Sequence, residues 1–212
     1  MKLHAIRDAD ATPVDWWFMY KLPHGAGAPK GSTSTAAPST GWEYLYFDAE
    51  TDGPLALSPL TLDKGQGALH KTLQPLYDAF GSKPYSLGWI SYNDEIPGAA
   101  NNDEAKGHSK GVLAFDLESD TAFWLLHSWP KFPALDAASA LGSVDYGQTY
   151  LCVSLKNVDA ARSIAEQMYF RNEPQTYDSH IPASLPPDDI FNKLANAVDV
   201  NKTDPPCDIT FL

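Results

Sequence analysis

The chain has 212 residues, of which 43% are apolar and 12% are aromatic, enough to bury the core of one domain or of half of a larger protein. Its net charge of −12 at pH 7 argues against broad electrostatic binding of nucleic acid at neutral pH. A phosphate-directed site would have to be locally positive, or work at acid pH, where histidines charge and carboxylates begin to protonate. No run of 18 apolar residues is present, so the sequence predicts no transmembrane helix.

The first forty-eight residues predict two strands joined by a long loop. Residues 14–23 are aromatic and lack clean alternation, which is typical of a strand buried on both faces of a sheet that helices cover. Residues 24–40 are rich in Gly, Ala, Pro, Ser and Thr and predict a loop. Residues 41–48 alternate better and predict a second strand.

A short helix and a third strand come next. Leucines within residues 69–77 fit one helix face, but Pro75 predicts a break or a kink there. Residues 85–92 predict a strand that ends in the polar triplet 93–95. Polar residues at a strand end can be site groups, although a surface turn explains them equally well.

Residues 107–116 predict a strand that carries His108 and Lys110 at its start. Residues two apart in a strand point to the same face, so these two side chains should project together. An imidazole can act as nucleophile, base or acid, and an ammonium can hold a phosphate oxyanion. The His-x-Lys pattern alone is weakly specific.

A second apolar run, residues 121–127, follows a short polar turn and predicts a hairpin with the preceding strand. If Asp116 and Thr121 close the turn, Lys110 lies opposite His127, with their Cβ atoms roughly 5 Å apart. The predicted cluster is therefore His108, Lys110 and His127. A structural alternative is that His127 only caps the strand end and bonds a backbone group.

The rest of the chain predicts a strand at residues 147–155 and amphipathic helices at 158–170 and 188–198. Residues 207–212 begin as a strand and stop with apolar residues, which suggests that the natural polypeptide continues. The two cysteines permit one disulfide without requiring it, and Cys152 fits a buried small hydrophobe.

Several segments, in order and at plausible spacing, resemble the deoxyribonuclease II family. The opening strand, the block around residue 75, Tyr92-Asn93-Asp94 and a block at 146–154 take part. The most specific segments are Gly107-His108-Ser109-Lys110-Gly111-Val112 and Phe123-Trp124-Leu125-Leu126-His127-Ser128, the latter followed by Pro130 and Phe132-Pro133.

The resemblance implies an α/β fold, with a mixed β-sheet flanked by helices, as one phospholipase D-like half of a pseudo-dimer. Such enzymes place a His-x-Lys from each half in a shared site, and only one is present here. We expect residues 1–200 to form the first half and 201–212 to begin a truncated second half. Two features depart from the family pattern: Ile6 stands near an expected cysteine partner of Cys152, and Asp116 follows Lys110 by six residues rather than five. Asp116 is therefore left out of the catalytic set.

The resemblance also implies a metal-independent acid endodeoxyribonuclease that cleaves double-stranded DNA and leaves 3′-phosphate ends, without a cofactor. His108, Lys110 and His127 are the expected catalytic residues, and Asn93 and Ser128 the expected substrate-binding residues. Secretion or a periplasmic location, a second half as a separate chain or missing segment, and a dimer are further expectations. No membrane partner is expected.

The expected mechanism is a two-step displacement through a phosphohistidine. One histidine attacks phosphorus and the other protonates the leaving 5′ oxygen, but the sequence does not assign His108 to either role. His127 could orient the phosphate or share the acid role. Two other classes remain open: an inactive DNA- or phosphate-binding module, and a zinc hydrolase using His108 and His127, for which a third ligand is not evident.

Overall fold

The computed structural model describes residues 2–27, 37–99, 107–136 and 141–196. Eight strands form one sheet in the order β10-β6-β7-β8-β9-β3-β4-β5, and its ladders are antiparallel. A separate ribbon pairs β1 (Ala5–Ile6) with β2 (Pro13–Val14). The sheet strands are β3 (Trp16–Lys21), β4 (Glu43–Asp48), β5 (Ala56–Thr61), β6 (Leu87–Asn93), β7 (Lys110–Asp116), β8 (Thr121–His127), β9 (Gln148–Leu155) and β10 (Thr176–His180).

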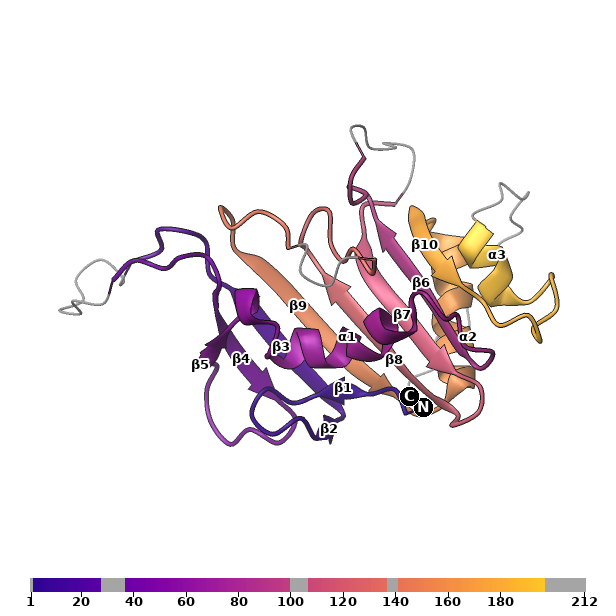
Figure 1. Ribbon diagram of the computed structural model, residues 1–212, viewed down its shortest axis with the longest axis horizontal. Coiled ribbons are helices and arrows are strands. Elements are labelled where there is room, and N and C mark those ends of the chain that lie inside the picture. The colour runs from indigo at the N-terminus through magenta and orange to yellow at the C-terminus, as the bar shows by residue number, and fades with distance from the viewer. Residues whose placement is uncertain (1, 28–36, 100–106, 137–140, 197–212) are drawn as a thin grey trace.

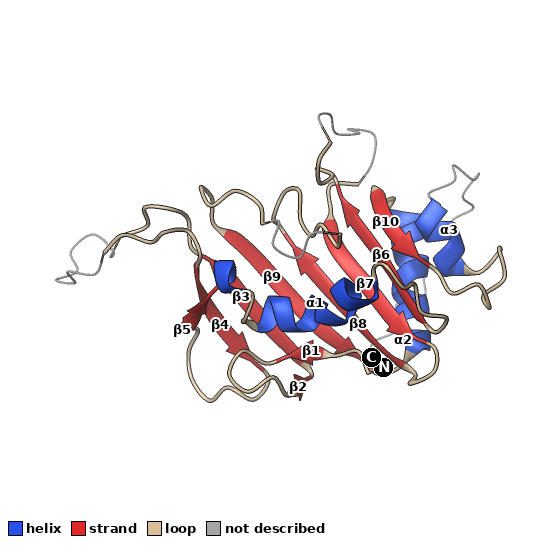
Figure 2. Ribbon diagram, viewed as in Figure 1, coloured by secondary structure: helices blue, strands red, loops and turns tan. Residues whose placement is uncertain are grey.

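Helices cover both faces of this sheet, which confirms the predicted α/β architecture, but the strands pair antiparallel throughout the described sheet rather than forming the mixed sheet expected. Figure 1 shows α1 (Ala68–Ala79) in front of the central strands, with α2 (Val158–Gln167) and α3 (Ile190–Asn196) behind the other face. A single 3₁₀ turn, η1 (Leu62–Lys64), and a π-helical turn, η2 (Met168–Asn172), adjoin α1 and α2 (Figure 2). Because side chains alternate along a strand, β7 supplies Val112 and Ala114 to the core under α1, and Leu113 and Phe115 to the core under α2.

Two predictions about the first elements are wrong. Strand β3 alternates cleanly, with Trp17, Met19 and Lys21 buried and their neighbours partly exposed, so its aromatic run is not buried on both faces. Helix α1 is a single element that runs through Pro75, so the predicted break does not occur there. A proline inside a helix costs about 3 kcal/mol, whereas each buried leucine of α1 contributes roughly 1.5–3 kcal/mol, and the packed face therefore decides the outcome.

The other sequence-based elements fall close to the observed ones. The second and third strands, the hairpin, the strand at 147–155 and the helix at 158–170 are confirmed as β4, β6, β7–β8, β9 and α2, the last ending in η2. Asn157 caps α2 by accepting a hydrogen bond from the Ala160 amide at 3.0 Å. The last helix is confirmed as the shorter α3; residues beyond 196, including the strand expected at 207–212, lie outside the described residues.

Cys152 is buried and has a free thiol, as its apolar setting predicted, and burial raises its pKa well above the usual range. Cys207 and a disulfide to it lie outside the described residues. Within the described ranges, no helix has the length and apolar character required to cross a bilayer.

Candidate active site

Buried polar side chains gather at one end of the sheet, on the face that α1 covers. Antiparallel pairing brings them there, since each comes from the matching end of its strand: Lys110 pairs with Asn93, and Lys21 pairs with Gln148. His127 ends β8 beside Tyr150 of β9. The polar members of this row are Lys21, Asn93, Lys110, His127 and Gln148. A row of buried polar groups is costly unless each has a partner, so their contacts indicate what the site does.

Asp94 joins the two residues of the His-x-Lys pattern. One carboxylate oxygen contacts Nδ1 of His108 and the other contacts Nζ of Lys110. His108 precedes β7 in a bend rather than within the strand as predicted, yet both side chains reach the same carboxylate. The His108 side chain is 91% exposed, whereas Lys110 is buried. With Nδ1 held by Asp94, the Nε2 of His108 is left to meet a ligand from solvent.

Lys110 and His127 face each other across the hairpin. The β7–β8 register pairs Asp116 with Thr121 and Gly111 with Leu126, which sets Lys110 opposite His127 as predicted. Burial lowers the pKa of Lys110, although Asp94 supplies a counter-charge. Asp116 lies at the far end of the same strand, about 20 Å away at the usual rise per residue. It therefore takes no part in this site.

His127 is buried as a neutral imidazole. Its Nδ1 accepts a hydrogen bond from the Trp129 amide at 3.1 Å, so Nδ1 carries no proton and Nε2 does. Nε2 is buried and has no hydrogen-bond partner among the described residues. Burial, followed by the charge of Lys110, lowers the pKa of His127 to about 3. The ring therefore presents one unsatisfied N–H donor among the described residues, and it stays uncharged at mildly acid pH.

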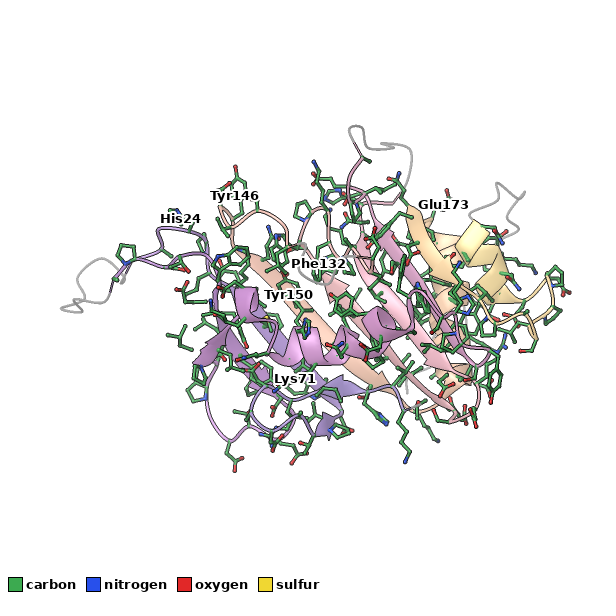
Figure 3. All side chains as sticks on the ribbon, in the orientation of Figure 1. His24, Lys71, Phe132, Tyr146, Tyr150 and Glu173 are labelled. Atoms are coloured by element: carbon green, nitrogen blue, oxygen red, sulfur yellow. The ribbon has the colours of Figure 1, made fainter. Side chains whose placement is uncertain are left out.

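Aromatic rings account for this burial. The centroid of His127 lies 5.5 Å from that of Phe132 and 6.0 Å from that of Tyr150. Figure 3 labels Phe132 and Tyr150, which lie together over the sheet beside α1. The Tyr150 hydroxyl is also buried without a partner in the described part of the chain. These two unsatisfied polar atoms on paired residues leave hydrogen-bonding capacity in the site that no described residue uses.

The two predicted substrate-binding residues occupy different settings. Asn93 is fully buried, and its amide donates to the carbonyls of Trp129 and Phe132 at 3.1 and 2.9 Å. Its own oxygen accepts from the Glu95 amide at 2.8 Å, so in this structure Asn93 fixes the loops around the site. Ser128 is exposed and donates to the Gln148 oxygen at 2.5 Å. Their roles toward substrate remain predictions.

Sequence reasoning gave no role to two of these residues. Asp94 belonged to the polar triplet at the end of β6 and to the Tyr92-Asn93-Asp94 block of the resemblance, and these two signals could have found it. Lys21 gave none: it reads as an ordinary strand-end lysine, yet its Nζ is fully buried and donates to the carbonyls of Leu22, Gly41 and Val144 at 3.0–3.2 Å. It ties the loops beside the site to β3.

The zinc alternative lacks a ligand set in this part of the molecule. Nδ1 of His127 is occupied by an N–H donor, and Nδ1 of His108 is engaged by Asp94. Across the described ranges, no group of three or more His, Cys, Asp or Glu side chains is placed to hold a metal ion. Structural and catalytic zinc sites use three or four protein ligands, so these residues do not assemble one.

Comparison with known proteins places this arrangement in a family. The family model described as Deoxyribonuclease II matches residues 7–209. The chain belongs to the deoxyribonuclease II family. A putative deoxyribonuclease-2 of Burkholderia pseudomallei is 43% identical over 173 residues, covering 81% of this chain and 46% of the relative. Human deoxyribonuclease-2-beta is 32% identical, covering 84% of this chain and 47% of the relative.

A third relative carries a different name. Plancitoxin-1 of Acanthaster planci is 34% identical over 203 residues, covering 92% of this chain and 52% of the relative. The chain thus spans about half the length of the curated relatives that it matches.

Proposed function

We propose that this chain is one half of an acid endodeoxyribonuclease, and that the cluster of His108, Lys110, His127 and Asp94 forms its part of the active site. The observation that carries the proposal is the contact of His108 and Lys110 with one carboxylate, beside the unsatisfied N–H of His127. Family membership supports DNA as the substrate. The reaction is hydrolysis of the phosphodiester, leaving a 3′-phosphate.

Each side chain has a distinct role in this proposal. A histidine attacks phosphorus and the P–O5′ bond breaks, while a second histidine gives its proton to the leaving 5′ oxygen. Water then attacks phosphorus, the P–N bond breaks, and the 3′-phosphate is released. His108 is one of these two histidines, oriented by Asp94 through Nδ1. Lys110 and the neutral His127 hold the non-bridging oxygens as N–H donors, without a metal.

We assign His127 the role of a neutral hydrogen-bond donor rather than that of the general acid. A pKa of about 3 leaves too few protonated imidazoles near pH 5 for proton donation to the leaving group. In this proposal the second reacting histidine comes from outside the described residues. We extend the proposal accordingly: residues 1–200 form the first half of a phospholipase D-like pseudo-dimer, residues 201–212 begin the second, and the second half supplies the other His-x-Lys. Dimerisation and export to an acidic or periplasmic compartment remain part of the proposal.

Acid pH reduces the electrostatic repulsion between this negatively charged chain and DNA. With a formal charge of −12 at neutral pH, the protein repels DNA at long range. Protonation of histidines and carboxylates near pH 5 removes much of that repulsion and brings DNA within reach of the local cations.

The test is plasmid nicking at pH 5 in EDTA, with this chain joined to its second half and with each half alone. The proposal predicts cleavage only by the joined enzyme. A denaturing quench in base, with DNA labelled at the 5′ end, should trap the labelled strand on a histidine. Cleavage that EDTA abolishes would contradict metal independence. DNA binding without cleavage by the joined enzyme would instead support the inactive binding module.

A further inference from the structure

A pocket of about 520 Å³ adjoins the proposed catalytic cluster at the same end of the sheet. Its lining includes Trp129, Lys131, Leu141, Tyr146 and Gln148. We infer that this pocket binds the base of a nucleotide that flanks the scissile phosphate. The inference rests on the proposed function and names a substrate contact that the proposed chemistry does not require.

The pocket shares its wall with the catalytic cluster. Trp129 donates its amide hydrogen to His127 and also lines the pocket. Gln148 lines the pocket as well, and its oxygen accepts from Ser128, the residue after His127. A strand that places a phosphate against His127 therefore has its neighbouring base within reach of this pocket.

The walls are held in place before any ligand arrives. The indole N–H of Trp129 donates to the Ser143 carbonyl at 3.0 Å, and Nζ of Lys21 lies 5.8 Å from the centroid of the Trp129 ring. Elsewhere in the lining, the Lys131 amide donates to the Glu95 carbonyl at 2.9 Å. A preformed pocket costs less ordering entropy when a ligand binds, so these contacts favour a binding role.

The lining matches a flat heterocycle with a polar edge. Tyr146 is 72% exposed, and among the described residues none bonds its hydroxyl, so its ring is free to stack on a base. Figure 3 shows Tyr146 on the loop above β9, at the end of the sheet where Phe132 and Tyr150 lie. Because the Gln148 oxygen is taken by Ser128, its amide N–H groups are left to donate to a base edge. Exposed Lys131 adds positive charge for a neighbouring phosphate.

The experiment uses the complete enzyme and an oligonucleotide with one mapped cleavage site. Abasic residues replace the nucleotides around that site one at a time, and kcat/KM is measured at pH 5. Removal of the flanking base should lower kcat/KM between about fivefold and 150-fold, the range for one stacked base. Tyr146→Ala should lower kcat/KM on intact DNA by a similar factor and abolish the abasic penalty. Tyr146→Phe should behave like the wild type.

Tyr85→Ala is the matched control, because Tyr85 is 76% exposed but lies before β6, at the other end of the sheet. It should leave both measurements unchanged. An abasic profile that is flat in the wild type, or unchanged in Tyr146→Ala, would overturn the subsite alone. Loss of binding between the two halves, expressed as separate chains, in Tyr146→Ala would also overturn it, by showing that the second half covers this pocket. Absence of cleavage by the wild type would overturn the proposed function itself.

Discussion

The backbone amide of Trp129 donates to Nδ1 of His127 across 3.1 Å, and this one bond fixes the tautomer of a buried imidazole. The proton must then reside on Nε2, which has no partner in the described part of the chain. Lys110 stands opposite and disfavours a second positive charge. His127 is thus arranged as a neutral hydrogen-bond donor, which limits the parts it can play in phosphodiester chemistry.

We expect the His127 ring to remain neutral throughout the acid working range. Nuclear magnetic resonance of ¹⁵N-labelled protein should show a non-titrating Nε2–H tautomer between pH 4.5 and 8, because burial holds the pKa at about 3. His127→Gln keeps an N–H donor and should retain far more activity than His127→Ala. A ring that titrates near pH 6 would contradict the neutral role.

The stability of the protein should decrease as the pH is lowered, because of the same His127 imidazole. The native pKa of about 3 lies below the unfolded value of 6.5, so the unfolded chain binds more protons between these limits and the free energy of unfolding falls as pH falls. From pH 7 to pH 4.5 this contribution is about 2–3 kcal/mol. In urea unfolding, the free energy of unfolding of His127→Gln should decrease less between pH 7 and pH 4.5 than that of the wild type, because the variant lacks this contribution. Equal pH dependence in both proteins would refute the shift.

Asp94→Asn tests the carboxylate that joins the His-x-Lys pair. Loss of the carboxylate frees the orientation of His108 and leaves the buried Lys110 unpaired. We expect kcat/KM of the complete enzyme to fall about 10- to 100-fold and its pH profile to move. Asp159→Asn, at a side chain that is 89% exposed on α2, is the control and should change neither. An unaltered pH profile in Asp94→Asn would assign Asp94 a structural role only.

Lys21→Met tests how much the buried Lys21 ammonium, which holds the loops beside the site, contributes to stability. The substitution removes donors to three backbone carbonyls and should lower the free energy of unfolding by about 3 kcal/mol or more. Lys64→Met removes an exposed ammonium and should cost little. Chemical denaturation of both variants gives the comparison. Equal stability would show that water satisfies these carbonyls after substitution.

The hairpin was the most predictable part of the fold. Apolar periodicity and a short polar turn set the register of β7 and β8, and that register alone places Lys110 opposite His127. Strand β10 was not predicted because its sequence is polar. Strand β5 was not predicted because Pro59 interrupts its sequence, which is compatible with its position at the edge of the sheet. Tertiary packing, rather than local preference, made them strands.

The site residues also differ in how far the sequence alone predicts them. His108, Lys110 and His127 were chosen from side-chain chemistry and from resemblance, and the fold brings Lys110 against His127 and against the carboxylate that it shares with His108. Asp94 is 14 residues from His108 along the chain, and only the β6–β7 pairing makes them neighbours. The neutrality of His127 depends on rings of Phe132 and Tyr150 and could not be read from its sequence neighbours.

The most direct measurement is the rate of plasmid nicking by the complete enzyme carrying His108→Ala, at pH 5 in EDTA. His24→Ala is the matched control, because His24 is also an exposed histidine but lies outside the cluster. If His108 reacts with the phosphodiester, its replacement lowers the rate by about 10²- to 10⁴-fold while the control cleaves normally. Cleavage by His108→Ala near the wild-type rate would contradict the assignment of this site.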